Sequence, residues 1–450
     1  FAYDDLCIAQ IAKAIGNAPV YERFIQRAQN WKNLFDPVTG FMRPRRNCGF
    51  PQPFDPFQVD FNYTEANAWQ YSLFVPHDLG TLREYLGGRD SLTSWLDRLF
   101  RANSITTGRE QADITGLIGQ YAHGNEPSHG FAYYYQAGSP VSHNKSFDIV
   151  ERIQRDLYGL TPDGLCGNED CGQMSAWLVC SMLGDYPLVP GTPASFDGLT
   201  IDQRTEQAWT IRDHIVTPLP VIQGPALPFA DSATIEIYCA DQRARILISV
   251  KEEGKPYYKH YYRGPFTISN AAVVTAKASA EGCIESREVY AVYKKRDASK
   301  LITYVTPFSA QYTAGGDQAL VDGQRGSADF RTGSWQGWQT QHTEVVVDLG
   351  KEQPITYVGL GCLQDIKSWI WYPTHIEIWV SHDGQTFSRA AGVKNEKADN
   401  DYTPGVQELG AHLRASARYV KVVAYNYGTI PPWHLGSGGN SWIFADELII

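Results

Sequence analysis

The sequence predicts a multidomain α plus β protein, in which a helical region is followed by two antiparallel β-sandwich modules. Three observations carry this prediction. Apolar residues recur at helical spacing up to about residue 190, short β-rich segments follow from about residue 230, and a second group of such segments begins near residue 308. The chain has 450 residues, 43% hydrophobic and 13% aromatic, which is enough to build two or three cores.

Residues 1–193 are predicted to form helical hairpins arranged in a ring, with the loops gathered at one end. Residues 4–15 and 20–35 place apolar side chains about 3.6 residues apart. Further helical segments are expected at 66–74, 90–100, 143–158 and 171–183. They alternate with loops rich in Gly, Pro and Asp, such as residues 35–57.

Two β-sandwiches are expected after residue 229. Residues 194–229, rich in Pro and Gly near their end, are predicted to be a linker. Residues 230–296 contain five short β-rich segments separated by turn residues, which predicts a small β-sandwich. Residues 305–450 contain further strand-like segments, among them TEVVVDLG, HIEIWVS and RYVKVVAYN, spaced as in antiparallel Greek-key modules.

Charge and composition argue against several classes of partner. A net charge of −10 without long runs of like charge gives no basic footprint for DNA, RNA or anionic membranes. No window holds 18 consecutive apolar residues, so no transmembrane segment is expected. The chain begins FAYDDL without a methionine, so we expect any signal peptide to have been removed or to lie outside this sequence.

The eight cysteines predict neither a disulfide scaffold nor a zinc site, because they are scattered along the chain. Cys166 and Cys171 are the only closely spaced pair, and no second pair matches them. The aromatic residues are more informative. Twelve Trp and 26 Tyr exceed what packing requires, and flat rings stack on the C–H faces of sugars, although most of these rings are expected to be core residues.

Three polar clusters precede predicted helices in the first region. Residues 60–78 contain Glu65 at a helix start, with His77 and Asp78 after a proline. Residues 123–130 read HGNEPSHG and place Glu126 before a proline suited to a first helical turn, and residues 163–177 place Glu169 and Asp170 before another helix. In a helical ring, these helix starts could converge on one pocket.

Such acids also cap helices, so each one taken singly is explained equally well by capping and by catalysis. Three glycine-flanked clusters together favour chemistry. Paired carboxylates beside aromatic platforms suit glycoside hydrolysis, and a further acid with amide oxygens suits calcium. Zinc at His77, His123 and His129 is a weaker alternative, because their spacing is not HExxH. The sequence contains no G-x-S-x-G elbow and no phosphate-binding P-loop.

Several long motifs in order, including TEANAWQYSLFVPHD, GLIGQYAHGNEPSHG and DGLCGNEDCGQMSAWLVCSML, resemble the catalytic region of glycoside hydrolase family 92, the calcium-dependent exo-α-mannosidases. The resemblance covers about residues 1–193 and corresponds to the later part of that catalytic unit. It implies a partial (α/α)6 barrel. The family's N-terminal sandwich and first barrel helices are not visible, so we expect the chain to be a fragment or one piece of a longer protein.

The resemblance also implies roles for individual residues. Glu65 corresponds to the general acid and Asp170 to the general base of an inverting mechanism, which places their carboxyl groups roughly 6.5–9.5 Å apart. Asn125 and Glu126 match the position that contributes to the calcium and substrate site. The remaining matched residues are assigned to pocket lining: Trp69, Gln70, His77, Asp78, His123, His129, Asn168 and Glu169.

Three positions depart from the family pattern. Many relatives carry Asp where this chain has Asn168, a second His where it has Gly130, and Gly where it has Ala66. Loss of the carboxylate at Asn168 removes a group that could tune the base. These departures bear on substrate detail more than on the class of reaction.

The later modules resemble two other families. The middle region is similar to the chitobiase C-terminal type of β-sandwich, a spacer to which no site is assigned. The last region resembles a discoidin-like (coagulation factor V/VIII type C) carbohydrate-binding module, which implies a structural calcium near Asp322 and Glu447. A sugar platform is expected from a subset of its tryptophans, of which about half should be core: Trp335, Trp369, Trp371, Trp433 and Trp442.

Together these features predict an exo-acting α-mannosidase that hydrolyses terminal α-linked mannose from glycans by an inverting, Ca²⁺-assisted mechanism. The alternative is a non-catalytic carbohydrate-binding or adhesion protein with a remnant glycosidase region. The expected partners are mannose-containing glycans, not nucleic acids. Such substrates are met outside the cell, so we expect a secreted, periplasmic or cell-surface protein of bacterial source.

Overall fold

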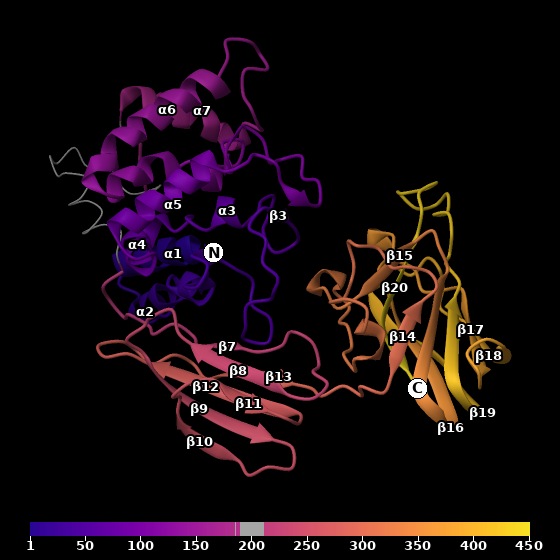
Figure 1. The fold of residues 1–450 in the computed structure, drawn as a ribbon. Helices are drawn as coiled ribbons and strands as arrows, with labels where there is room; N and C mark the ends of the chain where they lie inside the picture. Colours follow the sequence, from indigo (N-terminus) through magenta and orange to yellow (C-terminus); the bar gives the residue numbers. More distant parts are fainter. Residues whose placement is uncertain (185, 190–210) are drawn as a thin grey trace. The chain divides into compact units, whose positions relative to one another are not determined.

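The computed structural model describes residues 1–184, 186–189 and 211–450 (Figure 1). The chain divides into two compact units. The first comprises Phe1–Gly224, Ile235–Phe266 and Val273–Val292, and the second comprises Pro225–Thr234, Thr267–Ala272 and Tyr293–Ile450. The domain boundary expected at residue 193 and the first part of the predicted linker, residues 194–210, lie outside the described residues.

The first unit begins with the predicted helices. The α-helices are α1 (Ala2–Ala14), α2 (Ala18–Arg27), α3 (Ala68–Tyr71), α4 (Leu79–Tyr85), α5 (Arg89–Arg101), α6 (His143–Leu157) and α7 (Gln173–Leu183). Each predicted helical segment contains one of them, and α4 is additional. Two helices are shorter than expected. The segment 20–35 divides into α2 and a 3-10 turn, η1 (Asn30–Asn33), while α3 ends at Tyr71, three residues before the end of its predicted segment.

Short 3-10 helices bring the polar clusters into the fold. They are η2 (Pro76–Asp78), η3 (Glu126–Ser128), η4 (Phe131–Ala137), η5 (Pro140–Ser142) and η6 (Asp170–Gly172). Three of them contain sequence-predicted site residues. The polar clusters therefore occupy tight turns that lead into helices, and not the interiors of helices.

The helical core is built on α5. Leu92, Trp95, Leu96 and Leu99 recur at helical spacing and are at most 1% exposed. Burying each side chain contributes about 1.5–3 kcal/mol. The Trp95 indole donates to the carbonyl oxygen of Gly40 at 3.0 Å, so its polar edge is satisfied within the core.

A small β-sandwich follows the helices. Its three-stranded sheet contains β7 (Val221–Gln223), β8 (Ala233–Tyr238) and β11 (Phe266–Ile268) in the order β11-β8-β7. Its four-stranded sheet contains β9 (Arg245–Glu252), β10 (Tyr258–Tyr261), β12 (Ala272–Ser279) and β13 (Val289–Tyr293) in the order β10-β9-β12-β13. The five predicted strands are present. β7 and β10 are additional, and β7 falls within the predicted linker.

The sandwich is joined to the helical region by hydrogen bonds from the 45–48 loop. Asn47 exchanges two bonds with the main chain of Val292, at 2.8 and 2.7 Å. The main-chain N–H of Ile222 donates to the carbonyl of Cys48 at 3.0 Å. The Arg45 guanidinium bridges the carbonyls of Cys48 and Pro220. The sandwich was expected to be a spacer, but most of its residues belong to the same compact unit as the helices.

The second unit is dominated by a seven-stranded antiparallel sheet. Its strands are β14 (Leu301–Tyr304), β15 (Gln336–Gln339), β16 (Thr343–Gln364), β17 (His375–Ser381), β18 (Ser388–Lys394), β19 (Gly405–Ala424) and β20 (Trp442–Ile449). The order is β15-β20-β16-β19-β17-β18, and β14 pairs with β16. Because β14 precedes residue 305, this module begins earlier than the sequence predicted. The fold class of helical region followed by two sandwich-like modules is confirmed.

The tryptophans of this unit divide between core and surface. Trp335 and Trp371 are 1% exposed and are core residues, so they cannot serve as a sugar platform. Trp442 is half-buried. Trp369 and Trp433 are 39% and 45% exposed and remain available for stacking. In the described ranges, no helix is long and apolar enough to cross a membrane.

Candidate active site

Glu65 lies immediately before α3, in a loop that a complete capping box holds in place. The Asn67 side chain accepts from the main chain of α3, while the Gln70 side chain accepts from the main-chain N–H of Asn67 at 2.9 Å. Glu65 itself is exposed and has a positive φ of 52°. This left-handed backbone costs a non-glycine residue on the order of 1 kcal/mol or more, and such strain recurs at functional sites.

Asn125 links the second cluster to the first. It precedes η3, and its side-chain Nδ2 donates to the main-chain oxygen of Glu65 at 3.1 Å. The bond spans 60 residues of sequence and ties the HGNE turn to the strained residue. The structure therefore brings Glu65 and Asn125 together, as the convergence of helix starts predicted.

Two glycines bring the third cluster against the second. A Cβ atom on Gly167 would lie 2.6 Å from the Cα of Gly124, which is closer than any real contact. The backbones of the 124–125 and 163–168 turns therefore pack directly on each other. Glycine suits both positions, because a Cβ on Gly167 would meet main-chain atoms of Gly124 and a Cβ on Gly124 would overlap the Thr115 side chain.

The two acids of the third cluster, Glu169 and Asp170, have different surroundings. Glu169 Oε1 accepts from the main-chain N–H of Ser175 at 3.1 Å, so this carboxylate caps the first turn of α7. Asn168 Nδ2 donates to Asp113 at 3.1 Å. Asp170 opens η6 and is exposed. Of the acids assigned to this cluster, Asp170 is thus the one whose carboxylate faces solvent, as a base that activates water requires.

The carboxylates of Glu65 and Glu126 both lie close enough to the hydroxyl group of Tyr71 to affect its pKa. Burial raises the pKa of this phenol, the hydrogen bond with the Thr64 side chain opposes the rise, and the charges of Glu65 and Glu126 raise it further. Two residues 61 positions apart in sequence therefore act on one hydroxyl. The sequence analysis did not single out Tyr71. Its place in the motif TEANAWQY was the only available signal.

His123 is held in a buried relay of hydroxyl groups. The hydroxyl of Tyr158 donates to the carbonyl of Met174 at 2.9 Å, so it accepts from His123 Nε2 at 2.6 Å. His123 Nδ1 then accepts from the hydroxyl of Tyr121 at 2.7 Å. Burial, with a smaller contribution from the nearby His129, lowers the His123 pKa to about 3, which keeps the ring neutral.

His129 closes the same turn from inside. Its Nε2 donates to the carbonyl of His123 at 2.9 Å, and its own carbonyl accepts from the Trp177 indole at 3.0 Å. Burial lowers the pKa of His129. His123 and His129 are at most 1% exposed, so they support the HGNE turn from within the core.

Trp69 and Gln70 are buried beside Glu65, with exposed fractions of 6% and 2%. Trp69 packs its ring edge-on to Phe41, with centroids 4.7 Å apart. Gln70 uses its amide oxygen in the capping box. Within the described part of the chain, Trp69 Nε1 and Gln70 Nε2 have no hydrogen-bond partner.

His77 and Asp78 make their contacts in another part of the helical region. His77 Nε2 bonds the carbonyl of Ala28 at 2.9 Å, and Asp78 accepts from the Trp31 indole at 3.1 Å. Asp78 is fully buried and lies 3.8 Å from Lys32, and burial shifts both pKa values toward the neutral forms. These contacts join η2 to α2 and η1, whereas the residues described above join the three acidic turns.

The donors near Glu126 are oxygen atoms, the type that calcium prefers. Asn125 uses its amide nitrogen to hold Glu65, which leaves its amide oxygen for a cation. Among the described residues, no three acidic, His or Cys side chains are grouped so that they could hold a metal ion. A calcium ion bound by Asn125 and Glu126 would therefore take its other ligands from carbonyl groups, water or sugar hydroxyls.

A cavity of about 600 Å³ lies elsewhere in the first unit, between α4 and the turn that joins β8 to β9. Its wall includes Thr81, Glu84, Tyr85, Asp241 and Arg243. No sequence-predicted site residue lines it. The three acidic turns are the stronger candidate for chemistry, because the Asn125–Glu65 bond and the contact of Gly124 with Gly167 bring these turns together.

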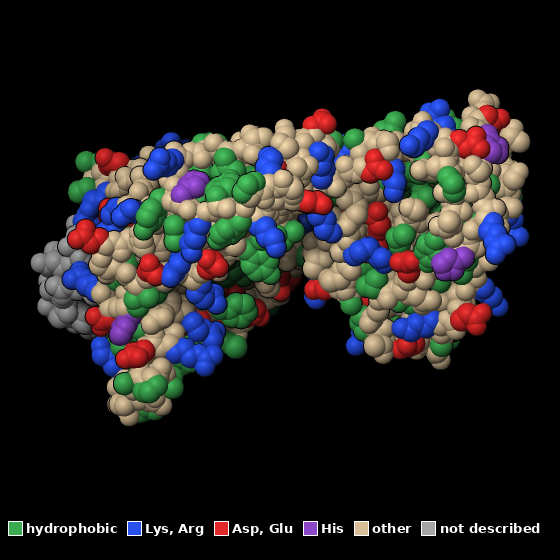
Figure 2. Space-filling view, turned by 90° about the horizontal axis from the view of Figure 1, so that it is seen from below, with side chains coloured by type: hydrophobic (Ala, Val, Ile, Leu, Met, Phe, Trp, Pro, Cys, Tyr) green, Lys and Arg blue, Asp and Glu red, His purple; other side chains and the backbone are tan. Residues whose placement is uncertain are grey.

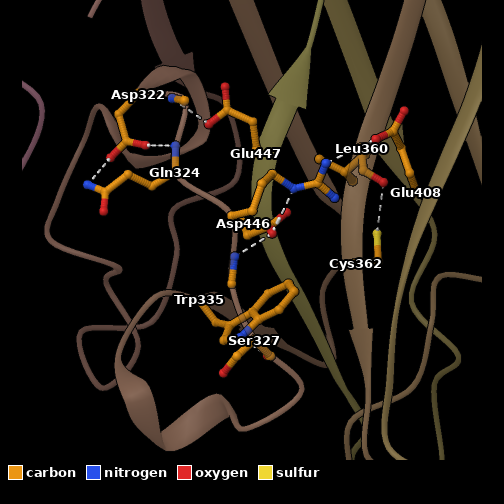
Figure 3. Close-up of polar contacts among 12 residues, drawn as sticks. Asp322, Gln324, Ser327, Trp335, Leu360, Cys362, Glu408, Asp446 and Glu447 are labelled. Atoms are coloured by element: carbon orange, nitrogen blue, oxygen red, sulfur yellow. Dashed lines mark hydrogen bonds and ion pairs between the residues drawn. The ribbon is translucent and has the colours of Figure 1, made fainter. Parts of the chain in front are cut away.

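A second group of buried acids lies in the later module (Figure 3). Asp322 accepts from the main-chain N–H of Gln324 at 2.7 Å, and Glu447 accepts from that of Gly323 at 3.0 Å. Asp446, the neighbour of Glu447 in β20, instead forms an ion pair with Arg325 at 3.0 Å. Asp446 is therefore compensated by a cation, while Asp322 and Glu447 share a loop held by main-chain donors.

The pKa values of these two acids follow from their surroundings. Burial raises the pKa of Asp322 to about 6, despite the hydrogen bonds from Gln324. Burial, together with the charges of Asp322 and Asp446, raises the pKa of Glu447 to about 7, despite the hydrogen bond from Gly323. Two nearly buried carboxylates with raised pKa values form an environment in which a hard cation would relieve both charges.

Comparison with known proteins covers both units. Residues 1–260 match the profile of the glycosyl hydrolase family 92 catalytic domain, and residues 302–442 match that of the F5/8 type C domain. The first match continues beyond residue 193, where the sequence analysis ended the resemblance. It includes β7 to β9 of the small sandwich, which therefore belongs to the matched catalytic region, as its hydrogen bonds to the 45–48 loop indicate.

Individual relatives are longer than this chain. An uncharacterized secreted glycosidase of Arthroderma benhamiae is 28% identical over 211 residues, which are 42% of this chain and 25% of that protein. A solved family GH92 α-mannosidase of Bacteroides thetaiotaomicron is 29% identical, with 59% of this chain and 33% of that chain covered and a TM-score of 0.37. The chain thus spans a quarter to a third of these proteins.

The later module has solved relatives of its own. The C-terminal domain of a chitobiase from Bacteroides fragilis is 15% identical, covering 34% of this chain and 91% of that one, with a TM-score of 0.23. A family 32 carbohydrate-binding module of Clostridium perfringens, solved with galactose, is 16% identical over 34% of this chain and 92% of that one, with a TM-score of 0.22. Because the catalytic-domain profile matches more than half of the residues, this chain belongs to glycosyl hydrolase family 92 and carries an F5/8 type C domain after the family region.

Proposed function

We propose that this chain forms part of an exo-acting α-mannosidase that releases terminal α-linked mannose from glycans with inversion. The observation that supports this most is the convergence of three turns. Asn125 bonds the main chain of Glu65, and Gly124 packs on Gly167 two residues before Glu169. The family membership supplies the reaction class, and the two exposed acids supply groups for it.

In this proposal, Glu65 protonates the leaving glycosidic oxygen and Asp170 removes a proton from the attacking water. Water adds to the anomeric carbon as the glycosidic bond breaks, and the bonding electrons leave with the protonated oxygen. Both residues are exposed, so a substrate can reach them from solvent. The left-handed backbone at Glu65, fixed by Asn125, sets the direction of the acid before substrate binds.

Calcium is proposed at Asn125 and Glu126, where it would supply positive charge to bind and orient sugar hydroxyls. The amide and carboxylate oxygens fit a hard cation. This chain's own contribution is to hold the two donors on one short turn, with Asn125 anchored to Glu65. A second calcium is proposed at Asp322 and Glu447, where it would stabilise the F5/8 type C domain.

The F5/8 type C domain is proposed to bind carbohydrate and to keep the hydrolase on its glycan. The exposed rings of Trp369 and Trp433 support this role. Trp369 has a left-handed φ of 65°, and Gly436 leaves room for its indole against the backbone. The alternative, a purely carbohydrate-binding protein, rests on the same two rings. Either function places the protein outside the cell or on its surface, where mannose-containing glycans are found.

The test uses a polypeptide that contains the complete catalytic unit of the family. Glu65→Gln and Asp170→Asn should each reduce mannose release by several orders of magnitude while leaving the fold intact. The control Glu110→Gln changes another exposed acid of the same region and should leave mannose release unchanged. Undiminished turnover in both site variants would refute the assignment. Glycan binding without any mannose release by the unaltered protein would favour the binding-only alternative.

A further inference from the structure

Strand β10 is an edge strand whose residues are not packed. It pairs with β9 at one edge of the four-stranded sheet. Strands of a sandwich bury alternate residues, and β9 does so, since Ile248 and Val250 are at most 1% exposed. In contrast, every residue from 253 to 261, including all of β10, is exposed. The strand therefore offers both of its faces to solvent.

Two aromatic rings of β10 lie on the side of the sheet that faces the core. Tyr258 pairs with Val250 and His260 with Ile248, and directly paired residues share a face of the sheet. The opposing sheet has three strands and leaves these rings uncovered. The rings are parallel within 6°, with centroids 5.3 Å apart. The two rings are stacked on each other and form an exposed aromatic pair beside the buried core.

The outer face of β10 is basic and aromatic. Tyr261 is 47% exposed, and the Arg245 guanidinium lies 4.2 Å from its ring centroid. Residues 245–263 contain five Lys or Arg and two Glu, a balance of +3 in a chain whose net charge is −10. Figure 2 views the protein from the side on which β10 lies in Figure 1 and shows hydrophobic side chains interspersed with Lys and Arg. The segment is thus a local basic patch on an acidic protein.

The strand is poorly suited to pairing with a peptide strand. It is only four residues long, carries Lys259 in its middle, and lies between Pro256 and Pro265. Short length, edge lysines and prolines are features that protect sheet edges against strand addition. Recognition by β10 therefore depends on its side chains, which combine flat rings with positive charge.

We propose that the β10 surface, comprising Arg245, Tyr258, Lys259, His260 and Tyr261, binds an anionic glycan chain. Sugar rings would stack on an outer face of the stacked Tyr258–His260 pair, because aromatic faces suit the C–H faces of sugars. Carboxylate, sulfate or phosphate groups of the chain would be held by Lys259 and Arg245. Charge complementarity selects an anionic chain, because residues 245–263 have a balance of +3 although the chain as a whole has a net charge of −10. The proposal does not depend on the hydrolytic function.

Affinity electrophoresis of the full chain at pH 7 tests this proposal. The gels contain polygalacturonate, dextran sulfate, neutral dextran or poly-glutamate. We expect the first two to retard the protein and the last two to have little effect. Tyr258→Ala and Lys259→Glu should each weaken the retardation about tenfold, whereas Tyr290→Ala and Arg287→Glu, which change exposed residues at and before β13, should not.

Each other result counts against the proposal. Equal retardation by neutral dextran would remove the requirement for charge, and equal retardation by poly-glutamate would favour an acidic protein partner. Retention of full binding by Tyr258→Ala and Lys259→Glu would place the site elsewhere. Circular dichroism spectra of the variants exclude unfolding as the cause of lost binding. Mannose hydrolysis is measured separately, so failure of this surface and failure of the proposed activity are distinguishable.

Discussion

The side chain of Asn125 donates a hydrogen bond to the main-chain oxygen of Glu65 at 3.1 Å, across 60 residues of sequence. This bond restrains a residue whose φ of 52° is unfavourable for any side chain larger than glycine. The arrangement gives Asn125 a positioning role for the proposed acid, besides its proposed role toward calcium. It also holds the HGNE turn (residues 123–126) against the TEAN turn (residues 64–67).

Removing this bond should impair catalysis more than folding. Asn125→Ala is expected to lower kcat by about fivefold or more, since one lost hydrogen bond costs about 1 kcal/mol and its loss releases the acid from its position. Steady-state kinetics with saturating calcium, which separates positioning from metal affinity, measures the effect. Asn62→Ala alters an exposed asparagine of the same loop that bonds only its neighbour Asp60, and it should leave kcat unchanged. Equal kcat values for both variants would contradict the positioning role.

The contact between Gly124 and Gly167 predicts a steric effect. Gly167→Ala should destabilise the protein by about 1–3 kcal/mol and reduce activity, because the two atoms nearest to its Cβ would be main-chain atoms of Gly124. Thermal unfolding and mannose release provide the two measurements. Gly130→Ala is the matched control, because its Cβ would lie 3.3 Å from the Tyr134 ring, a much milder contact than the 2.6 Å at Gly167. A Gly167 variant as stable and active as the control would contradict the close packing of the two turns.

The neutral state of His123 predicts a pH dependence of stability. Its pKa is lowered from 6.5 to about 3, so the unfolded chain takes up a proton below pH 6.5 while the folded protein does not. Stability is therefore lost as pH falls from 6.5 toward 3. His123→Asn should lose about 2 kcal/mol less than the unaltered protein between pH 7 and pH 5. Denaturant unfolding at the two pH values measures this, and His382→Gln, at an exposed histidine, should change nothing.

The raised pKa of Glu447 predicts that the stability of the F5/8 type C domain depends on pH in the opposite sense. Its folded pKa of about 7 exceeds the usual 4.5, so in chelator the domain loses stability as pH rises from 4.5 through 7. At pH 8 in chelator, Glu447→Gln should therefore raise the Tm. Calcium should raise the Tm of the unaltered protein and leave that of Glu447→Gln unchanged. Glu408→Gln, at an acid paired with Arg325, should retain the calcium response. A calcium-dependent Tm in the Glu447 variant would refute this metal site.

The sequence predicted the fold well where periodicity alone decides the structure. The 3.6-residue spacing of Leu92, Trp95 and Leu99 specifies α5, because a helix buries one face. Strand β12 alternates buried and half-buried residues, so its period of two was equally readable. The brief strands β7 and β10 were missed. β7 has only three residues, and the exposed residues of β10 carry no hydrophobic alternation.

The candidate site was only partly accessible from sequence. Glu65, Asn125 and Asp170 follow from motifs at helix starts, but the bond between Asn125 and Glu65 joins distant segments that no local pattern connects. His77 and Asp78 have the composition of pocket residues, yet they are at most 2% exposed and bind Ala28 and Trp31. A polar residue after a proline has the same local sequence pattern whether it lines a pocket or satisfies a buried donor.

The leaving-group dependence of hydrolysis tests the pairing of Glu65 as acid with Asp170 as base most directly. The dinitrophenolate group of a dinitrophenyl α-mannoside leaves without being protonated. In contrast, the glycosidic oxygen of an α-mannobiose must be protonated as the second sugar leaves. Glu65→Gln should therefore lose several orders of magnitude in kcat/KM on the mannobiose and far less on the dinitrophenyl substrate, while Asp170→Asn should lose activity on both. Equal losses on the two substrates in Glu65→Gln would contradict its role as the general acid.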